Sequence, residues 1–464
     1  MSTPTTGTRR ERSASQHLTP PGPRSSDAWR TAAAARDDRL RFISTLIEQY
    51  GDIVSFKLLF WQSYLVNHPD YLKHILHDNY PNYNKDVYLF NSVTKPLLGN
   101  GLISVAGGDS WLRQRRLVQP AFHRQRIAAL GTLITDDTSA LLQLWEDTSS
   151  RQQVIDVAEE MAHLTLRHVS KALFSIDISD KTHPFYQSLL YTSRFLSDYL
   201  HFPFPPLSVP LPRHRRLWRA IHSLDATVYD IIRQRRLHDE DVGDLLAMLL
   251  RVTDEDTGEG MNERQLRDEI MTFLVSGHDT SAPTLTWAWY LLAQHPEVEQ
   301  RFHAELDTVL AGRVPTVDDL PRLPYTRMVL EETMRLYPAV WLQMRKARQD
   351  DEIGGYHVPA NTWLLWSTYV MHRHPAFWEN PEQFDPLRFA PERATERHRY
   401  AYTPFGGGPR LCIGNYFAMT EMQLVLAMTA QRYRLILVPE QRIELEPVFT
   451  LRPRNGMLMR VEAR

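Results

Sequence analysis

Cysteine is the scarcest residue type in this chain, because its 464 residues include only Cys412. A lone cysteine cannot form an internal disulfide or complete a four-thiolate zinc or iron–sulfur site. Cys412 is therefore an inert core residue, a single metal ligand or a nucleophile. A chain without disulfides suits a reducing compartment, so we expect a cytoplasmic location.

Long apolar runs and a strong net charge are also missing. No apolar run reaches the roughly 18 residues that a membrane-spanning helix needs, so we expect no transmembrane anchor. The 53 Lys and Arg nearly balance the 55 Asp and Glu, which gives no basis for nucleic-acid binding. The start of the chain is polar and lacks the apolar segment of a signal peptide. We expect a disordered tail over residues 1–36 and a single domain over residues 37–464.

Helical patterns dominate what is present. The hydrophobic fraction of 43% suffices for a deep core. Residues 53–56 and 64–67 predict a β-hairpin, followed by a helix that begins near Pro69. Further helices are expected at about 110–126, 154–174, 185–200, 216–237, 262–294, 296–310 and 324–336, and strand-like segments at 352–358, 362–369 and 448–459, the last as a hairpin. The sequence predicts a mainly α, α+β fold, since no alternating βαβ pattern is present.

Cys412 lies in a glycine-rich loop that runs from Phe405 to Gly414. Glycines allow the backbone to approach a large flat group closely, and Arg410 favours the thiolate form of the cysteine. Phe405, Gly408, Arg410, Cys412 and Gly414 match the Phe-x-x-Gly-x-Arg-x-Cys-x-Gly haem signature, so the chain resembles the cytochrome P450 family. The resemblance implies the P450 fold, with a large helical region and small β-sheets around a buried haem b. It makes Cys412 the axial thiolate ligand, with Phe405 beside it and Arg410 at a haem propionate.

Two further motifs support this resemblance. Glu332 and Arg335 share one face of an expected helix, and Arg388 follows downstream. Such a pair usually marks a solvated surface, but in the P450 family these three residues form a buried structural charge network. Trp111 and Arg115 match the family pattern Trp-x-x-x-Arg, which makes them propionate contacts. The resemblance adds Arg345 as another basic contact and Gly414 as part of the haem-binding loop.

The expected helix at 262–294 resembles the oxygen-activation helix of the family. The resemblance assigns proton relay to Asp279 and a hydrogen bond to dioxygen to Thr280. The chain departs from the usual pattern by carrying Ser276 at the small-residue position and by adding Pro283. Because Gly277 weakens a helix and proline cannot donate to the preceding turn, we expect a distortion here. The alternative is an ordinary kinked helix with surface polar residues.

The substrate pocket is expected to be apolar. By resemblance to the family it is lined by Tyr88, Leu89, Phe90, Phe273, Leu274, Val340 and Phe449. Taken singly, each of these residues is better explained by plain core packing. The proline-rich segment at 202–212 is a candidate mobile entrance lid. The lining favours a hydrophobic small-molecule substrate.

These motifs predict a haem-thiolate monooxygenase that uses O2 and two electrons to oxidise a terpenoid, fatty acid or polyketide. A peroxide-rearranging relative and a non-catalytic haem sensor are the alternatives. No glycine-rich nucleotide loop follows Cys412, so we expect electrons from a separate ferredoxin or flavodoxin with its reductase. Arg113, Arg116, Arg124 and Arg126 are candidates for a basic docking patch, or simply a solvated face.

Overall fold

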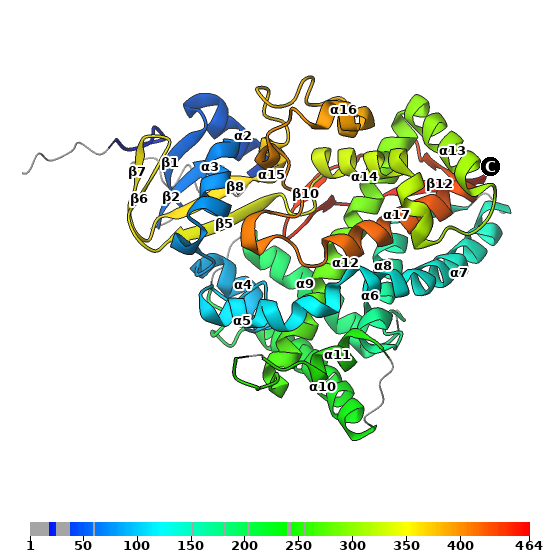
Figure 1. Cartoon of the computed structure of the whole chain (residues 1–464), viewed down its shortest axis with the longest axis horizontal. Coiled ribbons are helices and arrows are strands. Elements are labelled where there is room, and N and C mark those ends of the chain that lie inside the picture. The colour runs from blue at the N-terminus through cyan, green and yellow to red at the C-terminus, as the bar shows by residue number, and fades with distance from the viewer. Residues whose placement is uncertain are drawn as a thin grey trace, which may run out of the picture.

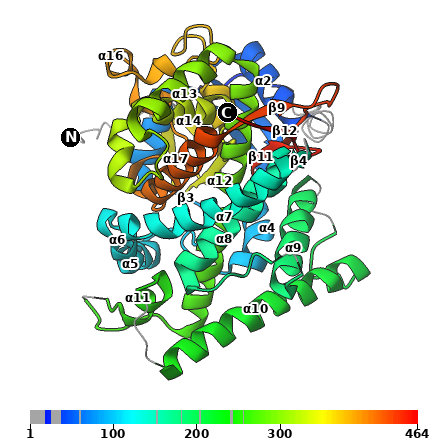
Figure 2. The ribbon, with the colours of Figure 1, turned by 90° about the vertical axis from the view of Figure 1, so that its right-hand side faces the viewer.

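A computed structural model describes residues 18–24, 38–58, 61–150, 153–180, 182–201, 205–238, 243–254 and 256–464. Its helices and sheets are segregated. Figure 1 shows the largest sheet on one side of the molecule and most of the long helices on the other. Figure 2 shows helix α10 (Pro212–His238) along one end of the molecule, and α9 (Pro184–His201) packs against it. The predicted combination of a large helical region with small sheets is confirmed.

The largest sheet has five strands in the order β1-β2-β8-β5-β3. Its strands are β1 (Ile53–Leu58), β2 (Trp61–Val66), β8 (Trp363–Ser367), β5 (Leu342–Ala347) and β3 (Tyr83–Asn84). Strands β1 and β2 pair antiparallel with Ile53 opposite Val66, which confirms the first predicted hairpin. Strand β2 runs parallel to β8, while β5 pairs antiparallel with β8 and carries Arg345. The sequence did not predict β5.

The smaller sheets correct two predictions. The segment at 352–358 is not one strand, because Gly354 and Gly355 both have positive φ and form the turn between β6 (Asp351–Ile353) and β7 (Tyr356–Val358). The expected hairpin at 448–459 is also wrong. Strand β11 (Leu451–Pro453) pairs instead with the preceding β10 (Leu445–Pro447). Strand β12 (Leu458–Ala463) lies between β4 (Val154–Asp156) and β9 (Tyr433–Leu437) in a three-stranded sheet.

Most of the predicted helices are present. Besides α9 and α10, they are α3 (Pro69–Lys73), α8 (Val157–Phe174), α12 (Glu263–Gln294), α13 (Pro296–Leu310) and α14 (Pro324–Leu336). The single helix expected at 110–126 is two helices, α5 (Asp109–Val118) and α6 (Arg124–Ala129). A short 3₁₀ segment with Pro120 separates them, since proline has no N–H to continue the α-helical ladder. The helices that the sequence did not predict are α2 (Arg39–Tyr50), α4 (Tyr88–Leu98), α7 (Gly131–Ser150), α11 (Leu245–Arg251), α15 (Thr368–Met371), α16 (Pro391–Ala394) and α17 (Asn415–Arg432).

Helix α12 is the central element, and it contacts α8, α10, α14 and α17. It continues through Gly277 and Pro283 without interruption, so the distortion expected there does not break the helix. Gly277 has a packing role instead. A Cβ at this position would lie 2.8 Å from Cγ2 of Val169 on α8. The glycine therefore permits α12 and α8 to pack closely.

Part of the segment assigned to a loose tail is held against the sheet. The carbonyl of Pro21 accepts a hydrogen bond of 2.8 Å from the N–H of Ser55 on β1, and the carbonyl of Leu18 accepts one of 2.9 Å from His357 on β7. Residues 18–24 therefore contact the strands, because these extended residues satisfy edge N–H groups. The remainder of 1–37 lies outside the described residues, as do residues 202–204 of the expected lid.

Candidate active site

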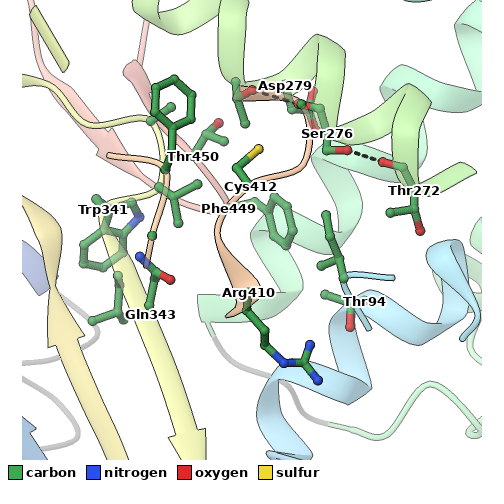
Figure 3. Close-up of a pocket in the computed structure, with 18 of the residues that line it drawn as sticks. Thr94, Thr272, Ser276, Asp279, Trp341, Gln343, Arg410, Cys412, Phe449 and Thr450 are labelled. Atoms are coloured by element: carbon green, nitrogen blue, oxygen red, sulfur yellow. Dashed lines mark hydrogen bonds between the residues drawn. The ribbon is translucent and has the colours of Figure 1, made fainter. Parts of the chain in front are cut away.

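A cavity of about 1050 Å³ lies between the sheet and α12. Its walls come from α4, α5, α12, β5, the loop before α17 and the residues before β11. Cys412 faces into it, so the side chain is accessible from the cavity although it lies deep within the protein. Figure 3 shows the Cys412 sulfur on one side of this space with Asp279 and Ser276 across from it. Most of the lining is apolar, which suits a hydrophobic ligand.

The conformation of the Cys412 loop depends on close backbone packing. Gly408 has φ +62°, and a Cβ there would lie 1.7 Å from the carbonyl oxygen of Leu76, so no other residue fits. The N–H of Cys412 donates to the carbonyl of Phe405 at 3.0 Å, which closes the loop. Burial raises the pKa of the Cys412 thiol, while the N–H of Gly414 and the charges of Arg115 and Lys85 act in the opposite direction. The Cys412 sulfur is therefore available as a single metal ligand, and the charged side chains that act on its pKa, Arg115 and Lys85, are cationic.

Four cationic side chains surround the Cys412 side of the cavity. Arg115 donates to the carbonyl of Leu411 at 2.8 Å, and Arg410 donates to the carbonyls of Val105 and Ala106. The Arg410 guanidinium also lies 4.4 Å from the ring centroid of Trp111. Lys85 and Arg345 complete the group. Among the described residues no carboxylate acts on the pKa of any of these four cations.

Burial lowers the pKa of Arg345 to about 9 and that of Arg410 to about 10. It also lowers the pKa of Lys85 well below its ordinary value, with repulsion from Arg345 and Arg410 adding to the effect. A site that gathers buried cations, with no carboxylate among the described residues acting on them, is suited to an anionic group. Lys85 was not found from the sequence, since no motif contains it.

Helix α12 presents Asp279 and Thr280 to the same cavity. Burial raises the pKa of Asp279, although His278 and Arg452 oppose the shift. The Thr280 hydroxyl donates to the carbonyl of Ser276 at 2.8 Å. His278 Nε2 lies 3.6 Å from Asp279 Oδ1, and burial lowers the His278 pKa. The acid therefore favours its protonated form more than a solvent-exposed aspartate does.

The predicted charge network forms behind the loop. Arg335 Nε and Nη2 donate to the two carboxylate oxygens of Glu332 at 2.6 and 2.8 Å, and Arg388 Nε lies 3.3 Å from Glu332. Arg335 also donates to the carbonyls of His372, Pro381 and Gln383. The side chains of Glu332 and Arg335 are fully buried. None of the three lines the cavity.

Comparisons with known proteins agree with this geometry. The family model for cytochrome P450 matches residues 20–460. The chain belongs to the cytochrome P450 family. It is 39% identical over 408 residues to cyclooctat-9-en-7-ol 5-monooxygenase of Streptomyces melanosporofaciens, with 86% of each chain covered. It is 32% identical to pentalenene oxygenase of Streptomyces avermitilis, with 92% of this chain and 93% of that protein covered.

Solved structures give the same result. The crystal structure of the cytochrome P450DA heme domain aligns with a TM-score of 0.87 at 29% identity, covering 97% of this chain and 98% of that one. This P450 is therefore a haem-thiolate monooxygenase that acts on hydrophobic compounds. No helix in the described part of the chain is both long and apolar enough to span a membrane.

The residues of this P450 fit a haem. The cavity offers one accessible sulfur donor from Cys412, and the four cations without a carboxylate partner suit the two haem propionates. A Cβ on Gly414 would meet no protein atom closer than 3.9 Å, so the space beside Gly414 belongs to the cavity. Gln343 lies two residues before Arg345 on β5 and also faces the cavity. Its amide is a second polar group that sequence motifs did not reveal.

Most of the residues predicted to line the substrate pocket do line the cavity. Tyr88, Phe90, Phe273, Val340 and Phe449 line the cavity. Leu274 does not, because it is fully buried in the core on another face of α12. Nothing is described for the Leu89 side chain. Of the expected lid, Pro206 reaches the cavity, and the neighbouring carbonyls of Pro205 and Leu207 accept hydrogen bonds from Tyr199 and Trp218.

Proposed function

We propose that this P450 hydroxylates a terpenoid. The observation that carries the proposal is the apolar cavity that joins Cys412 to the Asp279 and Thr280 pair on α12. The relatives named for cyclooctat-9-en-7-ol and pentalenene act on terpenoids, which favours this class over a fatty acid or polyketide. We further propose that residues 37–464 act as one catalytic domain and that the enzyme is cytoplasmic.

Haem, when bound, supplies the centre where O2 accepts two electrons and two protons, so that one oxygen atom enters the substrate and the other leaves as water. In this proposal Cys412 would ligate the haem iron, with Phe405 and Gly414 lining the space beside it. Trp111, Arg115, Arg345 and Arg410 would hold the propionates, together with Lys85.

Asp279 is the proposed proton donor. Its raised pKa keeps a proton available nearer neutral pH, as general acid catalysis requires. In this proposal His278, whose Nε2 lies 3.6 Å from Asp279 Oδ1, exchanges that proton with the acid. Thr280 would turn its hydroxyl from the Ser276 carbonyl toward dioxygen, because a hydroxyl hydrogen rotates freely between acceptors. The apolar wall holds the substrate and excludes bulk water.

The electron donor is proposed to be a separate ferredoxin or flavodoxin with its reductase. The basic patch expected to receive it is smaller than the sequence suggests. Arg116 lies 3.0 Å from Asp256, and Arg113 lies 3.5 Å from Asp254, so acidic residues before α12 neutralise both. Arg124 stays on the surface 5.4 Å from the ring of Tyr416, at the start of α17. A docking site for an acidic carrier would therefore centre on α6 and α17.

Two alternative functions are distinguishable. A peroxide-rearranging enzyme has no need of the proton donor that Asp279 supplies, and a haem sensor has no need of turnover. Purified enzyme with a surrogate ferredoxin, its reductase and reduced nicotinamide should convert a terpenoid that first shifts the haem spin state. Oxygenated product supports the proposal. Turnover with peroxide alone would support the rearranging class, and a spin-state shift without product or reductant consumption would support a sensor.

A further inference from the structure

Helix α12 carries a row of hydroxyl groups along the cavity. Thr272, Ser276, Thr280 and Thr284 recur at every fourth position, and all four line the cavity. Each donates its hydrogen to the carbonyl four residues earlier, at 2.8 Å for Thr272 and Thr280 and 3.0 Å for Thr284. Figure 3 marks the corresponding bond from Ser276 to the Thr272 carbonyl.

These bonds determine what the row can offer to a ligand. A serine or threonine hydroxyl has one donor hydrogen and two acceptor lone pairs. While the backbone takes the hydrogen, only lone pairs face the cavity. A ligand hydroxyl can donate to such a wall without breaking these bonds, whereas an ether or ketone oxygen can accept a hydrogen bond only if a hydroxyl gives up its backbone carbonyl.

Ser276 is the member of the row best placed to use this property. Thr272 and Thr284 are 2% and 3% exposed, and a Cβ on Gly101 would lie 2.1 Å from Oγ1 of Thr272, so that oxygen is covered. Thr280 is assigned to dioxygen. Ser276 is partly exposed, and it stands where the family pattern has a small residue. It precedes Thr280 by one helical turn, about 6 Å along the axis.

We propose that Ser276 Oγ accepts a hydrogen bond from a hydroxyl group of the substrate. The enzyme then takes a terpenoid that is already an alcohol, and holds that hydroxyl about one helical turn from Thr280. A preceding reaction must supply the alcohol, by oxygenation or by water capture during cyclisation. This inference rests on the proposed function and adds the donor that the substrate must carry.

The size of the effect follows from hydrogen-bond energetics. One net hydrogen bond corresponds to roughly 2- to 10-fold in affinity. The preference for the alcohol over a ligand without a donor stays in this range. When such a ligand binds, Ser276 keeps its hydrogen bond to the Thr272 carbonyl, so no buried donor is left without a partner. The preference should therefore be measurable without being absolute.

The test compares one alcohol with its methyl ether in the holoprotein. Geranylgeraniol and geranylgeraniol methyl ether share a skeleton and an oxygen but differ in the donor. Dissociation constants are measured by haem spin-state titration and by calorimetry for wild type, Ser276→Ala and Thr286→Val. The control Thr286 also sits on α12 and donates to a carbonyl at 2.8 Å, but it is 1% exposed and lies off the cavity.

We expect wild type and Thr286→Val to prefer the alcohol by roughly 2- to 10-fold, and Ser276→Ala to bind both ligands equally. Equal affinities in wild type, or a preference that survives in Ser276→Ala, would overturn the role of Ser276. If neither ligand binds a protein with an intact thiolate carbonyl spectrum, the terpenoid function itself fails. Binding of the ether and the alcohol with equal strength retains the terpenoid function while rejecting this inference.

Discussion

Replacing Arg335 with alanine should strongly lower the free energy of unfolding. Arg335 is fully buried and makes five hydrogen bonds, two to Glu332 and one each to the carbonyls of His372, Pro381 and Gln383. The alanine variant leaves these carbonyls without their donor and the Glu332 carboxylate buried with a weaker partner. Breaking a buried pair in this way costs about 3–5 kcal/mol in unfolding free energy.

The Arg335→Ala change should also weaken the support of the Cys412 loop. The backbone carbonyl of His372 is bound by Arg335, and the imidazole of His372 accepts the N–H of Thr403 at 2.9 Å. Thr403 in turn accepts the N–H of Gly406 at 3.0 Å. Loosening His372 therefore removes the support of the loop, and we expect Arg335→Ala and Glu332→Ala to be purified without haem.

Two comparisons make the prediction quantitative. Arg388→Ala removes one contact of 3.3 Å to Glu332 and a hydrogen bond of 2.9 Å to Asn380, so the expected loss is smaller, about 1–3 kcal/mol. Arg327→Ala is the matched control, because Arg327 pairs with Glu331 at 2.9 Å on the same helix but is 63% exposed. Its loss should stay below about 1 kcal/mol.

The assay is urea unfolding followed by near-ultraviolet circular dichroism, together with haem content from the reduced carbonyl spectrum. The expected order of unfolding free energies is Arg327→Ala above Arg388→Ala above Arg335→Ala. An Arg335→Ala protein with full haem content and the midpoint of the Arg327→Ala control would show that the network does not support the loop.

Four further changes have defined outcomes. Cys412→Ser should lose the carbonyl spectrum typical of thiolate ligation, and a retained spectrum would reject Cys412 as ligand. Thr280→Ala should divert reducing equivalents to hydrogen peroxide, measured as peroxide per reductant consumed; unchanged coupling would count against its role. Gly277→Ala should destabilise by about 1–3 kcal/mol in thermal unfolding because its Cβ meets Val169, and adding Val169→Ala should restore part of the loss. Burial raises the pKa of Glu269 from 4.5 to about 8, so the folded state holds a proton that the unfolded state releases. Stability from this group is full below about pH 4.5 and is lost as pH rises toward 8, by at most about 1.4 kcal/mol per unit, and Glu269→Gln should flatten that decline in urea midpoints.

Sequence motifs identified residues that are expected to bind the haem. Cys412, Arg410 and Trp111 line one cavity, as the resemblance to the P450 family implied. Lys85 could not be found this way, because it reaches the cavity from the segment between β3 and α4 and belongs to no motif. Its hydrogen bond of 3.3 Å to the Ile103 carbonyl exists only once two loops have packed together.

Helix α17 shows why other elements were missed. Its residues from Thr420 to Ala430 are all buried, so no polar face alternates with an apolar one and the helical period is absent. Leu274, by contrast, was predicted to line the pocket although the geometry of the helix excludes it. Successive residues on a helix point about 100° apart, so Phe273 and Leu274 cannot both face the cavity, and the period itself favours Phe273 together with Ser276 and Thr280.

The two faces of helix α12 differ in how much change they tolerate. Toward α8, Gly277 leaves no room for a Cβ, so packing fixes that position. Toward the cavity, Ser276 has open space beside its hydroxyl, and its neighbour Thr280 is constrained by chemistry rather than packing. A substitution at Ser276 can therefore alter ligand preference without disturbing the α12–α8 contact. Specificity is expected to vary most readily where a residue faces the cavity and takes no part in proton transfer, and Ser276 meets both conditions.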